Sequence, residues 1–283
     1  MGINVFTSLV NIVLDALFLI VFRWGVAGAA LASCIGMALG TVLGLLPFLR
    51  KKLPLRFVRG RVPLHQLAAL LANGSSEFFS SIAGSVLMVI LNSVLLHLAG
   101  TPAVSAFSIV MYVDSIVGAL LFGMADSMQP AISYNYGAGS RTRMFALEKR
   151  VLTAAAAISL AVLVWMQLGG EQVIPLFLKE EDSALLDMTL RAMELFSLSY
   201  LLGWVSTCLS SFFTALNRPG LSLVLAFSRT LVFPLLSLLV LPGALGLDGV
   251  WLISTSTGVL TAILSLLFLL RVLRQEKLLS WTA

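Results

Sequence analysis

A few ionisable side chains interrupt long apolar stretches of this sequence, and they are its main candidates for chemistry. Glu77, Asp114 and Arg229 each lie within such a stretch. An ionisable group at membrane depth costs at least a few kcal/mol, so it usually pairs with another group or lines a polar cavity. A carboxyl group in an apolar cavity can take up a proton or cation on one side of a membrane and release it on the other. We therefore predict that Glu77 and Asp114 bind a coupling ion, either H⁺ or Na⁺.

Each of these residues also has a purely structural interpretation. Glu77 follows Gly74, Ser75 and Ser76, and a carboxylate near a helix N-terminus favours the free backbone N–H groups there. Asp114 and Arg229 lie about ten residues into their apolar stretches from opposite ends, near mid-bilayer. They are candidates either for the substrate cavity or for a buried ion pair that fixes the packing of two helices.

Asn11 and Asp15 form a second polar pair, four residues apart. This spacing places both side chains on one face of a helix. They are further candidates for the substrate cavity, and packing against a neighbouring helix is the alternative.

The segment 129–143 is rich in residues that form turns. Pro130 predicts an end or a bend of the preceding helix, and Gly137 and Gly139 permit left-handed backbone. Tyrosines suit a membrane interface, as at positions 134 and 136. We interpret this segment as an intracellular hinge and structural lock rather than a binding site. Its predicted residues are Gln129, Pro130, Tyr134, Asn135 and Gly137.

Pro234 interrupts another apolar stretch. A proline within a helix frees a backbone carbonyl and permits a kink. Such a kink is either a hinge for transport or a static bend.

The amino-acid composition indicates that lipid, rather than water, surrounds these apolar stretches. Of 283 residues, 59% are hydrophobic and 11% are charged, against roughly 45–50% and about 25% in a soluble domain. Cys34, Cys208, His65 and His97 have no spacing typical of a metal site. We predict membrane lipid as a partner, and neither nucleic acid, a metal nor a cofactor beyond the coupling ion.

The apolar runs predict an all-α polytopic membrane protein with eight transmembrane helices. An interfacial turn of helix over 64–74 precedes the third of them. Apart from Arg229, the basic residues lie in the connecting segments or at the ends of these runs, and they fall on two sides, fourteen against three. Basic loops face the cytoplasm, which predicts a multi-pass protein of the plasma (inner) membrane with both termini cytoplasmic. The predicted spans are 2–22, 25–49, 75–98, 103–128, 150–169, 189–215, 219–241 and 247–270.

A pattern G-x-x-G-x-x-L-x-S occurs at 25–33 and again at 246–254, each time at the start of a predicted span. If the second span corresponds to the eighth, the repeat unit is six helices with the same orientation, as in one class of secondary transporter. The expected organisation is then an incomplete first bundle (1–50), a basic linker with the interfacial helix (51–74), a six-helix second bundle (75–272) and a cytoplasmic tail (273–283). Four further helices are expected before Met1.

Several motifs resemble the multidrug and toxic compound extrusion (MATE) family. They are N-I-V-L-D-A-L-F at 11–18, G-V-A-G-A-A-L-A at 25–32, N-G-S-S-E at 73–77, Q-P-A-I-S-Y-N-Y-G-A at 129–138 and F-F-x-A-L-N-R-P at 212–219. The resemblance implies a twelve-helix antiporter with two lobes, in which Glu77 is similar to an acidic residue on the first helix of the second lobe. The family's first four helices have no counterpart, nor does its carboxylate on the tenth helix have a match within 195–215.

The expected function is a secondary active transporter that exports organic cations or drug-like amphiphiles in exchange for H⁺ or Na⁺ by alternating access. One alternative is a lipid-linked saccharide flippase, although only Arg229 is available to bind a pyrophosphate. Another is a transport-inactive fragment. No D-x-x-x-D, H-E-x-x-H or G-x-S-x-G string occurs in any span, so we predict that the protein is not an enzyme.

Overall fold

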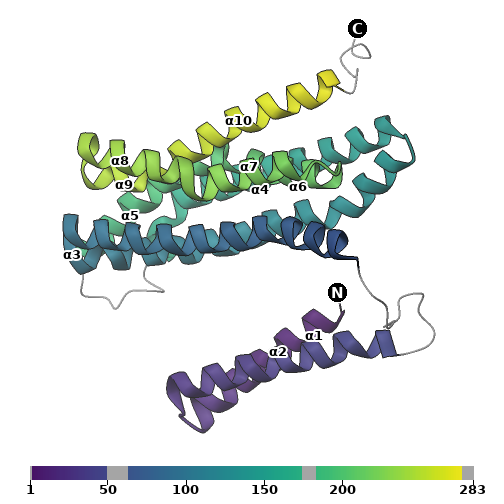
Figure 1. The fold of residues 1–283 in the computed structure, drawn as a ribbon. Helices are drawn as coiled ribbons and strands as arrows, with labels where there is room; N and C mark the ends of the chain where they lie inside the picture. The colour runs from purple at the N-terminus through teal and green to yellow at the C-terminus, as the bar shows by residue number, and fades with distance from the viewer. Residues whose placement is uncertain (1, 50–62, 174–182, 276–283) are drawn as a thin grey trace. The chain divides into compact units, whose positions relative to one another are not determined.

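The computed structural model describes residues 2–49, 63–173 and 183–275, and they are helical with no β-strand (Figure 1). The all-α prediction is confirmed for these residues. Half of the predicted basic linker and most of the predicted tail lie outside them. The elements are α1 (Gly2–Ala16), η1 (Leu17–Val21), α2 (Gly25–Leu49), α3 (Leu64–Gly137), α4 (Arg141–Val173), α5 (Ser183–Ser197), η3 (Leu198–Leu201), α6 (Gly203–Ala215), α7 (Pro219–Phe227), η4 (Ser228–Val232), α8 (Phe233–Leu245), α9 (Leu247–Trp251) and α10 (Ile253–Gln275).

Many of these helices are long and apolar enough to cross a membrane. Within the described residues there are six such helices, or seven if the bent pair Ala184–Leu201 and Gly203–Ala215 is counted as one span. The eight-helix count stays a prediction.

Chain contacts divide the molecule into two units, residues 1–67 and residues 68–283. In the first unit, α1 and η1 pack against α2 through small residues at four-residue steps, namely Gly28, Ala32, Gly36 and Gly40. A Cβ atom added to Gly36 would lie 3.2 Å from the Cβ of Asn11, and one added to Gly28 would lie 2.9 Å from the Cβ of Phe18. Small residues thus let two apolar helices approach closely, as is common in membranes.

In the second unit, α3 doubles back at Gly100. Gly100 has φ 74°, a left-handed conformation that glycine adopts without steric cost. Gly84 and Phe122 line one cavity, although a straight helix would hold them about 57 Å apart. The helix therefore consists of two limbs, and the predicted boundary between 75–98 and 103–128 falls at this turn.

Both ends of α3 differ from the prediction. The helix begins at Leu64 and continues through Gly74, so no separate interfacial turn precedes the third span. Glu77 lies roughly three turns after the first residue of the helix, and its interpretation as an N-terminal cap is wrong. At the other end the helix continues to Gly137, because a proline at position 130 removes only one hydrogen bond and its neighbours stay helical.

Later spans of the second unit contain irregular segments. The predicted span 189–215 is formed by α5, η3 and α6, with a bend of 41°. The predicted span 219–241 extends to residue 245 and contains the π-helical segment η4. The C-terminal helix α10, yellow in Figure 1, packs against α6 and α8.

A tight turn joins α8 to α10. The guanidinium of Arg191 on α5 binds Asp248 at 3.0 Å and Glu194 at 2.9 Å. Gly249 lies so close to the preceding helix that an added Cβ would be 2.3 Å from the carbonyl oxygen of Leu241. Only glycine fits there without movement of backbone.

We predict that Gly249→Ala destabilises the protein by about 1–3 kcal/mol, since the new methyl group meets backbone atoms that cannot rotate away. The measurement is thermal unfolding of the purified chain in detergent. Gly243→Ala is the matched control, because an added Cβ at Gly243 meets nothing within 4 Å. Equal melting temperatures for the two variants would contradict this account of the turn.

Candidate functional site

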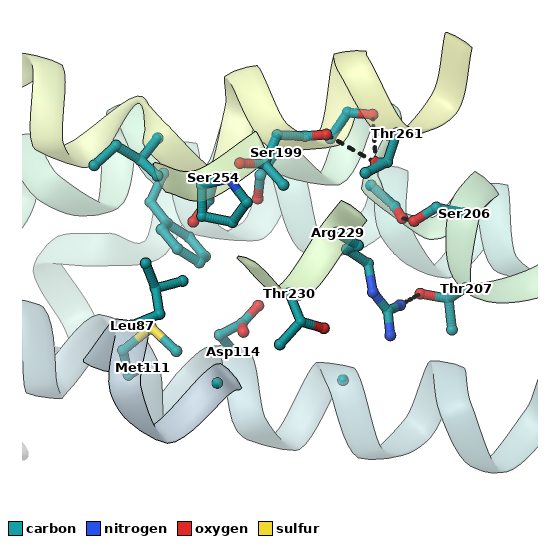
Figure 2. Close-up of a pocket in the computed structure, with 18 of the residues that line it drawn as sticks. Leu87, Met111, Asp114, Ser199, Ser206, Thr207, Arg229, Thr230, Ser254 and Thr261 are labelled. Atoms are coloured by element: carbon teal, nitrogen blue, oxygen red, sulfur yellow. Dashed lines mark hydrogen bonds between the residues drawn. The ribbon is translucent and has the colours of Figure 1, made fainter. Parts of the chain in front are cut away.

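The second unit contains a cavity of about 450 Å³ between both limbs of α3 and the segments η3, α6, η4, α8 and α10 (Figure 2). This volume suits a small organic molecule. One part of its lining is apolar: Leu87, Met88, Leu91, Phe107 and Met111. Another part carries hydroxyl groups: Ser199, Ser206, Thr207, Thr230, Ser254, Thr257 and Thr261.

Asp114 supplies the carboxylate of this cavity. It lies on the second limb of α3, and the hydroxyl of Tyr200 donates a hydrogen bond of 2.8 Å to its Oδ1 atom. Tyr200 belongs to the 3₁₀ turn η3 at the bend between α5 and α6, and its side chain is buried. The 3₁₀ turn thus places a hydrogen-bond donor, the Tyr200 hydroxyl, within reach of the Asp114 carboxylate. A regular apolar helix would offer no such donor.

Arg229 supplies the positive charge. Its Nη1 atom donates a hydrogen bond of 2.6 Å to the hydroxyl of Thr207 on α6, and its Cζ atom lies 4.8 Å from the centre of the Phe122 ring. This is a cation–π contact. The hydroxyl group and the aromatic ring together stabilise the positive charge of Arg229, which is partly removed from water.

The structure brings Asp114 and Arg229 into one cavity, as Figure 2 shows, and their charges interact. Each side chain also has a partner of its own, Tyr200 for the acid and Thr207 for the base. The cavity is therefore lined by two opposite charges, each held by a hydroxyl group.

Pro234 lines the cavity directly after the π-helical segment. It has no N–H group to donate to the preceding turn, and the N–H of Phe233 instead binds the carbonyl of Ser228, five residues back. The helix widens over 228–232, and this widened turn carries Arg229 and Thr230 into the cavity.

Asn11 and Asp15 belong to the first unit, apart from the described lining of the cavity. Asn11 packs against Gly36 of α2. The Oδ1 atom of Asp15 is buried and has no hydrogen-bond partner among the described residues. Glu77 lies in α3, and its side chain is outside the described part of the chain.

The segment 129–143 is mainly helical, which corrects its prediction as a loop. Gln129, Pro130, Tyr134 and Asn135 all lie in α3, and Gly137 is its last residue. The left-handed glycine of the turn is Gly139, with φ 71°.

Polar contacts tie this end of α3 to the rest of the bundle. The carboxylate of Asp126 accepts hydrogen bonds from Gln129 at 2.8 Å and from Ser211 of α6 at 2.7 Å. Asn135 donates to the carbonyl of Ala131 at 2.8 Å and closes the helix end by accepting from the N–H of Ser140. Of these contacts, the one between Ser211 and Asp126 joins α3 to α6. The role of the segment as a hinge and structural lock stays a prediction.

Sequence reasoning missed Tyr200, Thr207 and Phe122, the three residues that hold the two charges. The available signal was the repetition of serine and threonine on α6 and α10 at helical spacing, as in Thr257, Thr261 and Ser265. Hydroxyl groups can satisfy themselves on their own helix, as Thr261 and Ser265 do, so this signal alone does not locate a cavity. Within the described residues, no three His, Cys, Asp or Glu side chains come together as a metal site.

Comparisons with known proteins agree with this architecture. Multidrug export protein MepA of Staphylococcus saprophyticus subsp. saprophyticus is 27% identical over 271 residues, which cover 92% of this chain and 58% of MepA. Probable multidrug resistance protein YpnP of Bacillus subtilis is 27% identical over 183 residues, which cover 63% of this chain and 40% of YpnP.

Two solved structures share the fold. The crystal structure of MATE in complex with MaL6 has a TM-score of 0.85 at 24% identity, and the match covers 96% of this chain and 62% of that one. An outward-facing multidrug resistance MATE family transporter of the MOP superfamily has a TM-score of 0.84 at 24% identity, with 96% and 61% covered. The chain thus spans about three-fifths of the length of MepA and of these structures.

The MatE family model matches residues 78–239, more than half of the chain, and this segment includes Asp114, Tyr200, Thr207 and Arg229. With the apolar helices, the match identifies a multi-pass membrane protein. The chain belongs to the MatE family, the multidrug and toxic compound extrusion family that its motifs resemble.

Proposed function

We propose that the protein is a secondary active transporter that exports organic cations or drug-like amphiphiles in exchange for H⁺ or Na⁺ by alternating access. Its relatives MepA and YpnP are named as a multidrug export protein and a probable multidrug resistance protein. Transport, rather than an enzymatic reaction, is the activity that these names carry.

The cavity around Asp114 is the observation that carries the proposal. Its carboxylate faces a space lined by flexible methionine and leucine side chains, which adapt to ligands of different shapes. A cationic amphiphile would place its charge near the carboxylate and its apolar part against Leu87, Met88 and Met111. A proton or Na⁺ at the same carboxylate would compete with that charge, which is the basis of exchange.

Irregular helices beside the cavity favour a change of access. The bend between α5 and α6 holds Tyr200, and the π-helical turn η4 holds Arg229. Both charged side chains of the cavity are thus connected to places where the helical hydrogen-bond ladder is already broken. A change at either place alters the partners of Asp114 or Arg229.

The lipid-linked saccharide flippase is less favoured. A pyrophosphate needs several cationic groups, and the described lining of the cavity contains one, Arg229. That guanidinium also binds Thr207 and contacts Phe122.

For the membrane topology, we propose eight crossings in the plasma (inner) membrane with both termini in the cytoplasm. The turn at Gly100 supports this count, because it divides the longest helix into two limbs. On this arrangement, residues 1–50 supply two helices of the first bundle and residues 75–272 the second bundle.

Asp114→Asn should reduce proton-driven ethidium transport in reconstituted vesicles to the background of vesicles without protein. The amide keeps the size of the side chain, but it neither exchanges a proton nor attracts a cation. Transport is measured as ethidium fluorescence after an imposed pH gradient, and then an imposed Na⁺ gradient, which separates the two coupling ions.

Asp187→Asn is the matched control, since it removes the same charge from an exposed position on α5. Its transport should equal that of the wild type. Transport by Asp114→Asn at the wild-type rate would exclude Asp114 as the coupling group, and absence of wild-type transport under both gradients would overturn the proposed activity.

The topology predicts opposite accessibility for two loops. In a background with Cys34→Ala and Cys208→Ala, Thr142→Cys should react with a membrane-impermeant maleimide only after cells are permeabilised. Leu245→Cys should react in intact cells. Both positions are exposed, so a difference in labelling reports the side of the membrane. Labelling of both from the same side would contradict the eight crossings.

A further inference from the structure

Glu148 on α4 is a buried carboxyl group that the cavity does not use. The residue is 4% exposed, and its Oε1 atom is buried without a hydrogen-bond partner among the described residues. Its helix carries four basic side chains nearby, Arg141, Arg143, Lys149 and Arg150, and all of them are exposed. The acid therefore points inward where its basic neighbours point outward.

Apolar residues surround Glu148 along the buried face of α4. Met144, Val151 and Ala155 lie four residues before and three and seven residues after Glu148, on the same face, and are almost fully buried. The helix packs against α5, η3 and α6. The titratable group that interacts with Glu148 across this contact is the thiol of Cys208 on α6. Glu148 forms no ion pair with another described residue.

An ionised carboxylate in such a position would be an uncompensated charge. Removal of such a charge from water stays unfavourable even after relaxation of the surroundings. A protonated carboxyl group avoids most of this penalty, and it is compatible with the apolar packing of α4 against α6. Separation of these two helices would expose the Oε1 atom to water.

The contact is connected to the cavity through α6. Thr207, the residue before Cys208, holds the guanidinium of Arg229. Ser211, one turn further along, holds Asp126 of α3. A movement of α6 that changes the cavity therefore also changes the surroundings of Glu148.

We propose that Glu148 is a proton-binding site separate from the cavity, protonated while α4 and α6 are packed together and deprotonated when they part during transport. In the step, the O–H bond of the carboxyl group breaks, the proton passes to water that enters between the parted helices, and the carboxylate keeps the electron pair. The transport role rests on the proposed function, whereas the protonation of the packed state does not.

Infrared spectroscopy of the purified chain tests the protonation directly. At neutral pH, Glu148→Gln should lose a carbonyl band of a protonated carboxyl group that the wild type and Asp187→Asn both show. In the wild type, this band should shift in D₂O and disappear at strongly alkaline pH. A wild-type spectrum without a band that behaves in this way overturns the proposal, even if Glu148→Gln does not fold.

A second measurement separates this site from the transport function. Protons exchanged per ethidium are counted in vesicles with the wild type, Glu148→Gln and Asp187→Asn. The expected result is a lower proton count for Glu148→Gln alone, with ethidium binding retained. Coupled transport with an unchanged count would overturn the role of Glu148 in transport. Absence of proton-coupled transport in the wild type would instead overturn the proposed function, while the infrared band still reports the site.

Discussion

The interior of this protein offers charged groups very little solvation, and the arrangement of its polar side chains follows from that constraint. Asp114 has the hydroxyl of Tyr200, and Arg229 has the hydroxyl of Thr207 and the ring of Phe122. Many other hydroxyls bind carbonyls one turn back on their own helix, as Thr261 does. Groups that are not satisfied in this way, such as the Glu148 carboxyl, are therefore the most informative.

Irregular segments in the helices bring the charged side chains and their contact partners together. The 3₁₀ turn η3 carries Tyr200, the π-helical turn η4 carries Arg229, and Gly100 returns α3 so that both of its limbs line the cavity. A bundle of regular helices with the same sequence would present these side chains at other angles. The irregular segments have no binding role of their own. Each of them instead helps to orient side chains that line the cavity.

The fold was more predictable than the site. Apolar runs and basic loops predicted helices and most of their boundaries, because burial in lipid requires about 20 apolar residues for each crossing. The end of α3 was misjudged since Pro130 and Gly137 resemble turn residues in the sequence yet are accommodated in the helix. Asp114, Arg229 and Pro234 were selected for their rarity among apolar residues, and all three line the cavity. Their partners were not predictable, because hydroxyl and aromatic side chains are common in membrane helices and only the path of the chain brings them together.

The contact of Arg229 with Phe122 also bears on the strength with which this cavity can hold a cation. The ring face is already occupied by a resident positive group of the protein. A cation that stacks on the same face would have to displace this guanidinium. Its net gain would then be the difference between two cation–π energies, each about 0.5–2 kcal/mol. On this face the ring would therefore add less to the binding of an external cation than a ring without a resident partner would.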